Sequence, residues 1–210
     1  MSEHPEAGAR TSPRLSPLPP DQWDEAAKAM LRGKVKLADR YLSHDADAPR
    51  MPNVLGLLGH HPRLAAAWLG YNGVLLDEPA LAPRLRELLI LRVAWRARSQ
   101  YEWVQHVRIG RSLGLTEAHI AALTADEPSG LWTPLERLLL AAADQLLRGN
   151  RMHDATWDGL AAHLDTRQVL EVPFVVGSYL CLAMVFNSVG LELDPEMDAG
   201  SVPELRGTEE

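Results

Sequence analysis

Apolar residues recur at helical spacing along most of this chain, and no segment of useful length alternates apolar and polar residues as a half-buried strand does. Leu64, Trp68, Tyr71 and Leu75 illustrate the pattern, because residues spaced in this way fall on one side of an α-helix. Prolines, glycines and capping residues interrupt the pattern at intervals typical of helix ends. The sequence therefore predicts an all-α fold.

The interruptions predict where the helices begin and end. Asp21 is a candidate N-cap, Pro62 and Pro83 suit first helical positions, and Gly114 closes a helix that begins near residue 100. Residues 35–42 are also compatible with a helix. The other predicted helices span 21–31, 116–123, 133–147, 154–164 and 165–189, and the predicted loops span 44–52 and 126–132.

Composition divides the chain into four segments. Residues 1–20 contain five prolines and are expected to form a flexible or extended arm, followed by an N-terminal extension over residues 21–52. Residues 53–190 form the helical domain and residues 191–210 form the C-terminal tail, which is acidic and expected to be mobile after Pro195. A chain of 210 residues is long enough to build this as one domain around a sizeable core.

Net charge and cysteine content disfavour several functions. The formal net charge is −7 and the basic residues are scattered, so nucleic acid is not expected as a partner. The single cysteine, Cys181, cannot form an intramolecular disulfide, and we expect a reduced, cytoplasmic protein without a signal peptide. Cys181 lies in the apolar run Val172–Phe186, which is shorter than a membrane span needs. We therefore expect a buried helix there, with an unreactive thiol and no contact with a membrane.

Two polar residues stand on an otherwise apolar helical stripe. Glu102 and His106 are four residues apart and share one side of their helix with Ile109 and Leu113. A carboxylate and an imidazole that face the interior are costly unless something offsets their desolvation, so such a pair is a candidate for chemistry. Taken alone, a histidine on an apolar stripe is more often a hydrogen-bonded core residue.

The segment that contains this pair resembles the carboxymuconolactone decarboxylase and alkylhydroperoxidase D superfamily. There, a helix carrying R-x-R-E-L-x-x-L leads into a helix bearing either C-x-x-C-x-x-x-H or a cysteine-free E-x-x-x-H. The first element is matched here by Arg84-x-Arg86-Glu87-Leu88. Ser99 and Glu102 stand at the cysteine positions, and His106 stands at the histidine position.

The resemblance extends over residues 53–190 and implies an alkylhydroperoxidase D-like helical bundle of the cysteine-free branch. It also implies a homo-oligomer, a trimer or a hexamer, and the roles of three residues. His106 would be the acid/base, Glu102 would orient its ring, and Glu87 would relay a proton or tune the local charge. A competing interpretation pairs Glu87 with Arg84 one turn back, as a helix contact without a chemical role.

Further residues near the motif are candidates for contact with a substrate. Tyr101 suits a donor to a substrate oxygen, although packing explains it equally well, and packing is the simpler account of Trp103. Ser99 suits a helix N-cap, with a role at the site as the alternative.

Arginines near the motif are candidates to bind a substrate, whereas the histidines give no sign of a metal site. Arg84, Arg86 and Arg92 suit a substrate carboxylate, but a solvated helix face also explains them. The histidines show no recurrent metal-ligand spacing, so we expect neither a metal nor an organic cofactor.

Three functions are consistent with these residues. The first is a carboxymuconolactone decarboxylase-like lyase that uses the Glu/His pair for decarboxylation or a related proton transfer on a small carboxylated or lactone-type substrate. The second is an alkylhydroperoxidase-like antioxidant protein, which is disfavoured because its cycle needs two cysteines three residues apart. The third is a non-catalytic oligomeric protein that binds a ligand in the same helical pocket.

Overall fold

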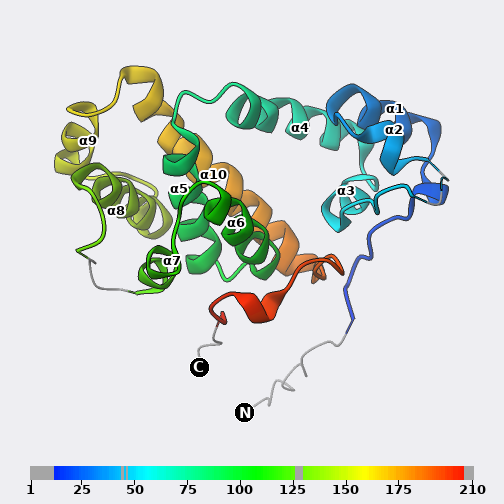
Figure 1. Ribbon diagram of the computed structural model, residues 1–210. Helices are drawn as coiled ribbons and strands as arrows, with labels where there is room; N and C mark the ends of the chain where they lie inside the picture. The colour runs from blue at the N-terminus through cyan, green and yellow to red at the C-terminus, as the bar shows by residue number, and fades with distance from the viewer. Residues whose placement is uncertain (1–11, 44, 46, 126–129, 206–210) are drawn as a thin grey trace, which may run out of the picture.

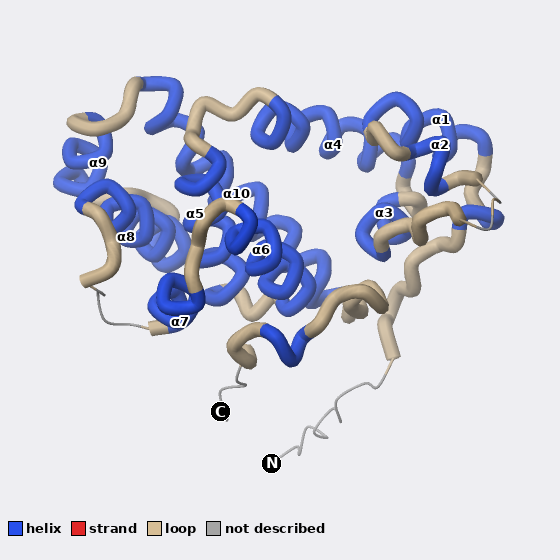
Figure 2. The backbone as a smooth tube through the Cα atoms, in the orientation of Figure 1, coloured by secondary structure: helices blue, strands red, loops and turns tan. Residues whose placement is uncertain are grey.

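The structure, a computed structural model, describes residues 12–43, 45, 47–125 and 130–205 (Figure 1). Within these residues it has ten α-helices, two short 3-10 helices and no strand, which confirms the predicted all-α class (Figure 2). The helices are η1 (Pro20–Gln22), α1 (Glu25–Lys34), α2 (Ala38–Tyr41), α3 (Asn53–Leu58), α4 (Pro62–Asp77), α5 (Pro83–Arg96), α6 (Gln100–Ser112), α7 (Glu117–Thr124), α8 (Pro134–Gly149), α9 (Asp154–Ala161), α10 (Thr166–Val189) and η2 (Ala199–Ser201).

Helix α5 is the centre of the molecule and packs against α6, α7, α8 and α10 (Figure 1). Every residue from Arg86 to Ala94 is buried. Leu89 and Ile90 belong to the larger core, which α8 and α10 share, whereas Leu88 and Leu91 belong to a second core with α6 and α7. A helix that is apolar nearly all round needs partners on several sides, and α5 has them.

The N-terminal helices α1, α2 and α3 gather around the first half of α4 (Figure 1). Trp23, Met30, Leu55 and Ala65 form a small apolar cluster there, separate from the cores around α5. The second half of α4 reaches the bundle, where Leu75 enters the larger core. Helix α4 therefore links the N-terminal cluster to the bundle.

Local capping explains most helix boundaries. Thr133 and Asp165 each form a capping box at the start of α8 and α10, and the His61 ring accepts a hydrogen bond from the backbone of α4. The first helix differs from the prediction, because Asp24 rather than Asp21 is its N-cap and accepts from Ala27 N at 2.7 Å. The predicted loops over 44–52 and 126–132 lie partly outside the described residues.

The N-terminal arm runs along the domain where the structure describes it. Arg14 N donates to Val189 O at 2.6 Å, and Leu18 N donates to Gly56 O at 3.0 Å. Residues 12–19 form no regular helix or strand, and residues 1–11 lie outside the described part.

The C-terminal segment is held by hydrogen bonds to α6. Trp103 Nε1 donates to Pro203 O at 2.9 Å, and Arg111 Nη2 donates to Ser201 O at 2.7 Å. Leu205 packs against the second core. The prediction of a mobile tail is therefore wrong up to residue 205, because the segment supplies acceptors and apolar contacts that α6 lacks.

Helix α10 is long and apolar enough to cross a bilayer by length and composition alone. In this fold one side of it is a core face, where Val172, Tyr179 and Phe186 pack in the larger core. The opposite side is open: Phe174 is 48% exposed, and Cys181 is also exposed. The prediction that Cys181 is buried is wrong, because the bundle covers only one face of this helix.

Candidate functional site

Close packing of α5 against α6 brings the motif residues together. A Cβ atom on Gly110 would lie 2.8 Å from Leu115 Cδ1 and 3.2 Å from Leu91 Cδ1, so glycine permits this approach. At the end of α6, Gly114 adopts φ +86°, which glycine tolerates and other residues rarely do. The sequence between Leu91 and Leu115 thereby sets how α6 lies on α5.

His106 and Glu87 form a buried pair across these two helices. His106 Nδ1 lies 2.7 Å from Glu87 Oε2, and the side chains are 11% and 1% exposed. Because an ionised carboxylate only accepts, Nδ1–H donates, which assigns the neutral ring the tautomer with its lone pair on Nε2. No hydrogen bond from the described residues occupies Nε2. The pair therefore presents a free imidazole nitrogen backed by a carboxylate.

This contact corrects two sequence-based expectations. The carboxylate that orients His106 is Glu87, not Glu102, because Glu87 reaches it from the neighbouring helix. The competing pairing of Glu87 with Arg84 is also wrong, since Arg84 Nη2 lies 3.1 Å from Glu136 Oε1 instead. Both errors come from considering only contacts within one helix.

Glu102 is a buried carboxyl group without a hydrogen-bond partner. It is 2% exposed, and neither side-chain oxygen is bonded by any residue in the described part of the chain. Burial raises the pKa of Glu102 to about 8; the Ser99 hydroxyl opposes this shift but is not placed to form a hydrogen bond. At neutral pH Glu102 is therefore mainly a neutral acid, one helical turn from His106.

Tyr179 is a member of this cluster that sequence reasoning missed. Its ring lies edge-on to the His106 ring, with centroids 5.0 Å apart and an interplanar angle of 89°. It comes from α10, where it shares the inward face with Val175, Val176 and Leu182. A tyrosine on the inward face of an apolar helix is the only signal in the sequence that points to it.

The three residues predicted to contact substrate have other surroundings. Tyr101 OH donates to Asp194 Oδ2 at 2.6 Å, and Trp103 Nε1 is bonded to the C-terminal segment. Ser99 stands at the N-cap of α6 and is fully buried, but its side chain makes no capping bond. The polar atoms of Tyr101 and Trp103 therefore serve the fold rather than an open site.

The three motif arginines are bonded within the protein. Arg84 pairs with α8, Arg86 Nη1 donates to Leu75 O at 3.0 Å, and Arg92 Nη2 lies 2.8 Å from Asp144 Oδ2. Arg86 and Arg92 are only 8% and 5% exposed, so a solvated helix face is the wrong description of both.

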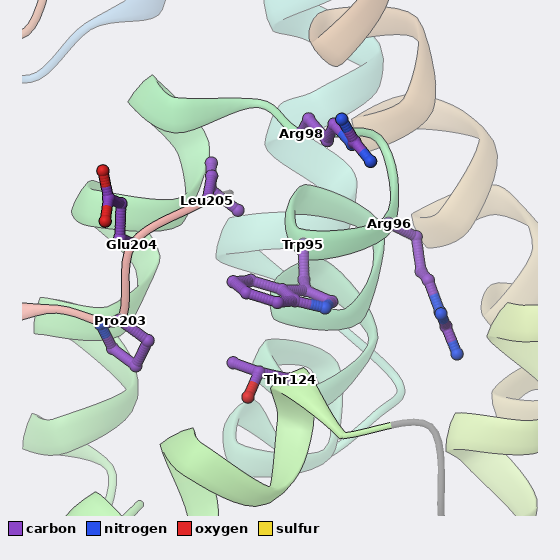
Figure 3. Close-up of a pocket in the computed structure, with 7 residues that line it drawn as sticks. All are labelled: Trp95, Arg96, Arg98, Thr124, Pro203, Glu204 and Leu205. Carbon is purple, nitrogen blue, oxygen red and sulfur yellow. The ribbon is translucent and has the colours of Figure 1, made fainter. Parts of the chain in front are cut away.

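The cluster is nearly closed to solvent. Pockets of about 470, 540 and 490 Å³ open elsewhere on the described surface, and none of them is lined by Glu87, His106 or Glu102. The first lies between Trp95 on α5 and the C-terminal segment (Figure 3). No group of three His, Cys, Asp or Glu residues in the described ranges is arranged to hold a metal ion.

Comparison with known proteins finds a family profile that matches this region. The profile of the Carboxymuconolactone decarboxylase family matches residues 62–145, which include Glu87, Glu102 and His106. No curated protein matches the sequence.

Solved structures share the fold at low sequence identity. A peroxidase-related protein with an alkylhydroperoxidase AhpD core, from Ralstonia eutropha JMP134, has a TM-score of 0.71 and 16% identity over 90% of this chain and 95% of that chain. A variant of the debrominase Bmp8 in complex with 2,3,4-tribromopyrrole has a TM-score of 0.67 and 15% identity over 89% and 95%. A putative antioxidant defence protein AhpD from Agrobacterium tumefaciens has a TM-score of 0.61 and 19% identity over 66% and 96%. The family match over residues 62–145 and this shared fold agree with the resemblance to the carboxymuconolactone decarboxylase and alkylhydroperoxidase D superfamily that the sequence motif indicates.

Proposed function

We propose that this protein is an enzyme that transfers a proton at carbon in a small carboxylated or lactone-type substrate, as in decarboxylation of the carboxymuconolactone type. The observation that carries the proposal is the bond of 2.7 Å between His106 Nδ1 and Glu87 Oε2, which leaves Nε2 without a partner. An imidazole changes its protonation state near neutral pH, so it suits general acid–base catalysis.

In the decarboxylation, the bond between the substrate's carbon and its carboxylate breaks and carbon dioxide leaves. The electron pair passes to a conjugated carbonyl oxygen and gives an enolate. His106, protonated at Nε2, then delivers its proton to the carbon and is protonated again from solvent. Glu87 stabilises the imidazolium form and fixes the ring while this happens.

Glu102 keeps the site compatible with an anionic substrate. With its pKa raised to about 8 by burial, it is mainly uncharged at neutral pH, whereas Glu87 is paired with His106. An additional ionised carboxylate would repel a substrate carboxylate. The neutral acid also supports His106 as a nearby source of protons.

The enclosure of the cluster supports a small substrate. His106 is 9% exposed and Tyr179 is 4% exposed, so the opening is narrow in a single chain. Exclusion of water strengthens the interactions between charged groups in such a site.

A thiol-based antioxidant function is the weaker candidate. Two solved structures of similar fold are peroxidase-related proteins, but a disulfide cycle requires two cysteines. This chain has only Cys181, on the exposed side of α10, and carries Ser99 and Glu102 at the positions of the redox pair.

The experiment measures carbon dioxide release from a panel of β-keto acids and lactone carboxylates. In His106→Ala we expect kcat/KM to fall by about 10²–10⁴-fold, the usual contribution of a positioned acid or base. Glu87→Gln and Glu102→Gln should also lower turnover. His163→Ala removes an exposed histidine outside the cluster and should not change turnover.

Two outcomes would contradict the proposal. The first is unchanged kcat/KM in well-folded His106→Ala. The second is a set of ligands that raise the melting temperature but are never turned over, which would support the ligand-binding alternative.

A further inference from the structure

The Tyr179 side chain is buried, but its hydroxyl is not held by a hydrogen bond in the described part of the protein. Tyr179 is 4% exposed, and none of the residues that the structure describes bonds its hydroxyl. Tyr101 OH and Tyr71 OH, by contrast, donate to Asp194 Oδ2 at 2.6 Å and to Phe174 O at 3.1 Å. The Tyr179 oxygen is not among the unpartnered side-chain atoms that are fully closed to solvent, so it is available for a hydrogen bond to a ligand.

Tyr179 lies directly beside His106. Its ring meets the His106 ring edge-on at 5.0 Å, within the cluster formed by α5, α6 and α10. Burial raises the pKa of the phenol, and the neighbouring carboxyl of Glu87 raises it further, opposed by Arg86. The hydroxyl therefore keeps its proton under ordinary conditions and can only act as a hydrogen-bond donor or acceptor, not as a base.

We infer that the Tyr179 hydroxyl donates a hydrogen bond to the substrate oxygen on which charge develops, while His106 Nε2 transfers the proton at carbon. This inference rests on the proposed function. The two groups come from different helices: Tyr179 on α10 bonds the substrate oxygen, and His106 on α6 transfers the proton to the substrate carbon. A donor aimed at the developing enolate stabilises the transition state more than the ground state, because the charge is largest there.

The division of work narrows the substrate class. The substrate must carry a carbonyl oxygen conjugated with the carbon that is protonated, so that one molecule reaches both groups. β-Keto acids and unsaturated lactone carboxylates meet this requirement. A simple carboxylic acid has no oxygen on which the electron pair can rest after the carboxylate leaves.

The test compares Tyr179→Phe with the matched control Tyr71→Phe, which removes a hydroxyl outside the cluster. Tyr179→Phe should lower kcat by about 10²–10³-fold, as loss of one oxyanion donor does, with little change in KM. Its unfolding free energy should stay the same or rise, because the oxygen removed has no partner. A hydroxyl that served only the fold would give lower stability and unchanged kcat.

A second measurement does not depend on turnover. Acetylacetone forms an enolate that mimics the proposed intermediate but has no carboxylate to lose, and calorimetry measures its binding. Tyr179→Phe should bind it about 10–100-fold more weakly than the unchanged protein, and Tyr71→Phe should bind it equally well. Suppose that Tyr179→Phe weakens acetylacetone binding but the protein turns over none of the β-keto acids and lactone carboxylates. Tyr179 would then still be a donor to an enolate oxygen, and the proposed function would be contradicted.

Other outcomes overturn the inference alone. They are failure of the unchanged protein to bind acetylacetone, binding that Tyr179→Phe leaves unaltered, and substrate turnover that falls in His106→Ala but not in Tyr179→Phe.

Discussion

Among the buried charged residues of helix α5, Glu87 and Arg92 have opposite surroundings. Arg92 is fully engaged: Nε and Nη2 each lie 2.8 Å from an oxygen of Asp144, and Nη1 donates to the carbonyls of Leu123 and Ala125. Glu87 is hydrogen-bonded to His106, and Arg86 Nε lies 4.0 Å from its other oxygen, while both oxygens of Glu102 lack a partner in the described part of the chain. The two clusters lie on the same helix and differ in how completely their polar atoms are bonded.

This difference separates a structural network from a candidate site. At Asp144 burial alone would raise the pKa, but the hydrogen bonds from Arg92 and Arg96 outweigh it and the pKa lies below its ordinary value. Glu102 has no such partners, and burial sets its pKa. A completed network stabilises one conformation, whereas an incomplete one leaves atoms available to a ligand.

The largest effect on stability is expected at the completed network. Asp144→Ala leaves the Arg92 guanidinium buried without its carboxylate, and such a break typically costs about 3–5 kcal/mol. Urea unfolding would measure the loss, with the exposed Asp158→Ala as control. The folded fraction of Asp144→Ala should keep the turnover of the parent. Equal stability of Asp144→Ala and Asp158→Ala would break the comparison.

A pH-dependent effect is expected at Glu102. Its folded pKa of about 8 lies above the ordinary value of 4.5, so the folded state holds a proton that the unfolded state releases between these values. Stability should therefore be highest below pH 4.5 for this group and fall as pH rises toward 8, by at most about 1.4 kcal/mol per pH unit. Glu102→Gln should remove this part of the slope. An unchanged slope from unfolding at several pH values would contradict the burial argument.

A change in assembly is expected at the open side of α10. Leu170, Phe174 and Met184 are 54%, 48% and 57% exposed and fall on one stripe of the helix. We propose that a copy of the chain covers this face, because stable interfaces bury apolar area of this kind. Light scattering should give an oligomeric mass that falls in Phe174→Glu but not in Leu37→Glu, a control among the N-terminal helices. A monomeric mass for the unchanged protein would refute the assembly.

The smallest effect is expected at Cys181. Hydroperoxide consumption with a dithiol reductant should stay at background, and Cys181→Ser should match the parent, because one cysteine cannot complete a disulfide cycle. Peroxide turnover that disappears in Cys181→Ser would instead favour thiol chemistry.

The sequence predicts the helices well because their signals are local. Pro62, Thr133 and Asp165 each start a helix through contacts or geometry in the next turn of chain. Their effect can therefore be predicted from the sequence alone. The family motif likewise brings Glu87, Glu102 and His106 to attention before any geometry is known. The sequence does not predict which side chains meet across two helices or which face of a helix the bundle covers.

Three residues show this failure. Glu87 was not recognised as the partner of His106 because the bond crosses from α5 to α6. Tyr179 joins the cluster from α10, with no spacing rule to connect it to the motif. Cys181 lies in an apolar run, and hydropathy alone does not show which face of a 24-residue helix the bundle covers.

The C-terminal segment supplies hydrogen-bond acceptors that the helices do not provide for themselves. Asp194 accepts both Tyr101 OH and Asn53 N, at 2.6 and 2.7 Å, and so joins the start of α3, helix α6 and the end of the chain. A nascent chain that has reached only residue 190 already contains every α-helix, yet these donors and the Trp103 indole lack their acceptors. Buried donors without acceptors destabilise a fold. A chain shortened to residue 190 should therefore keep its helices but unfold more readily than one that includes residues 191–205, which urea unfolding would measure.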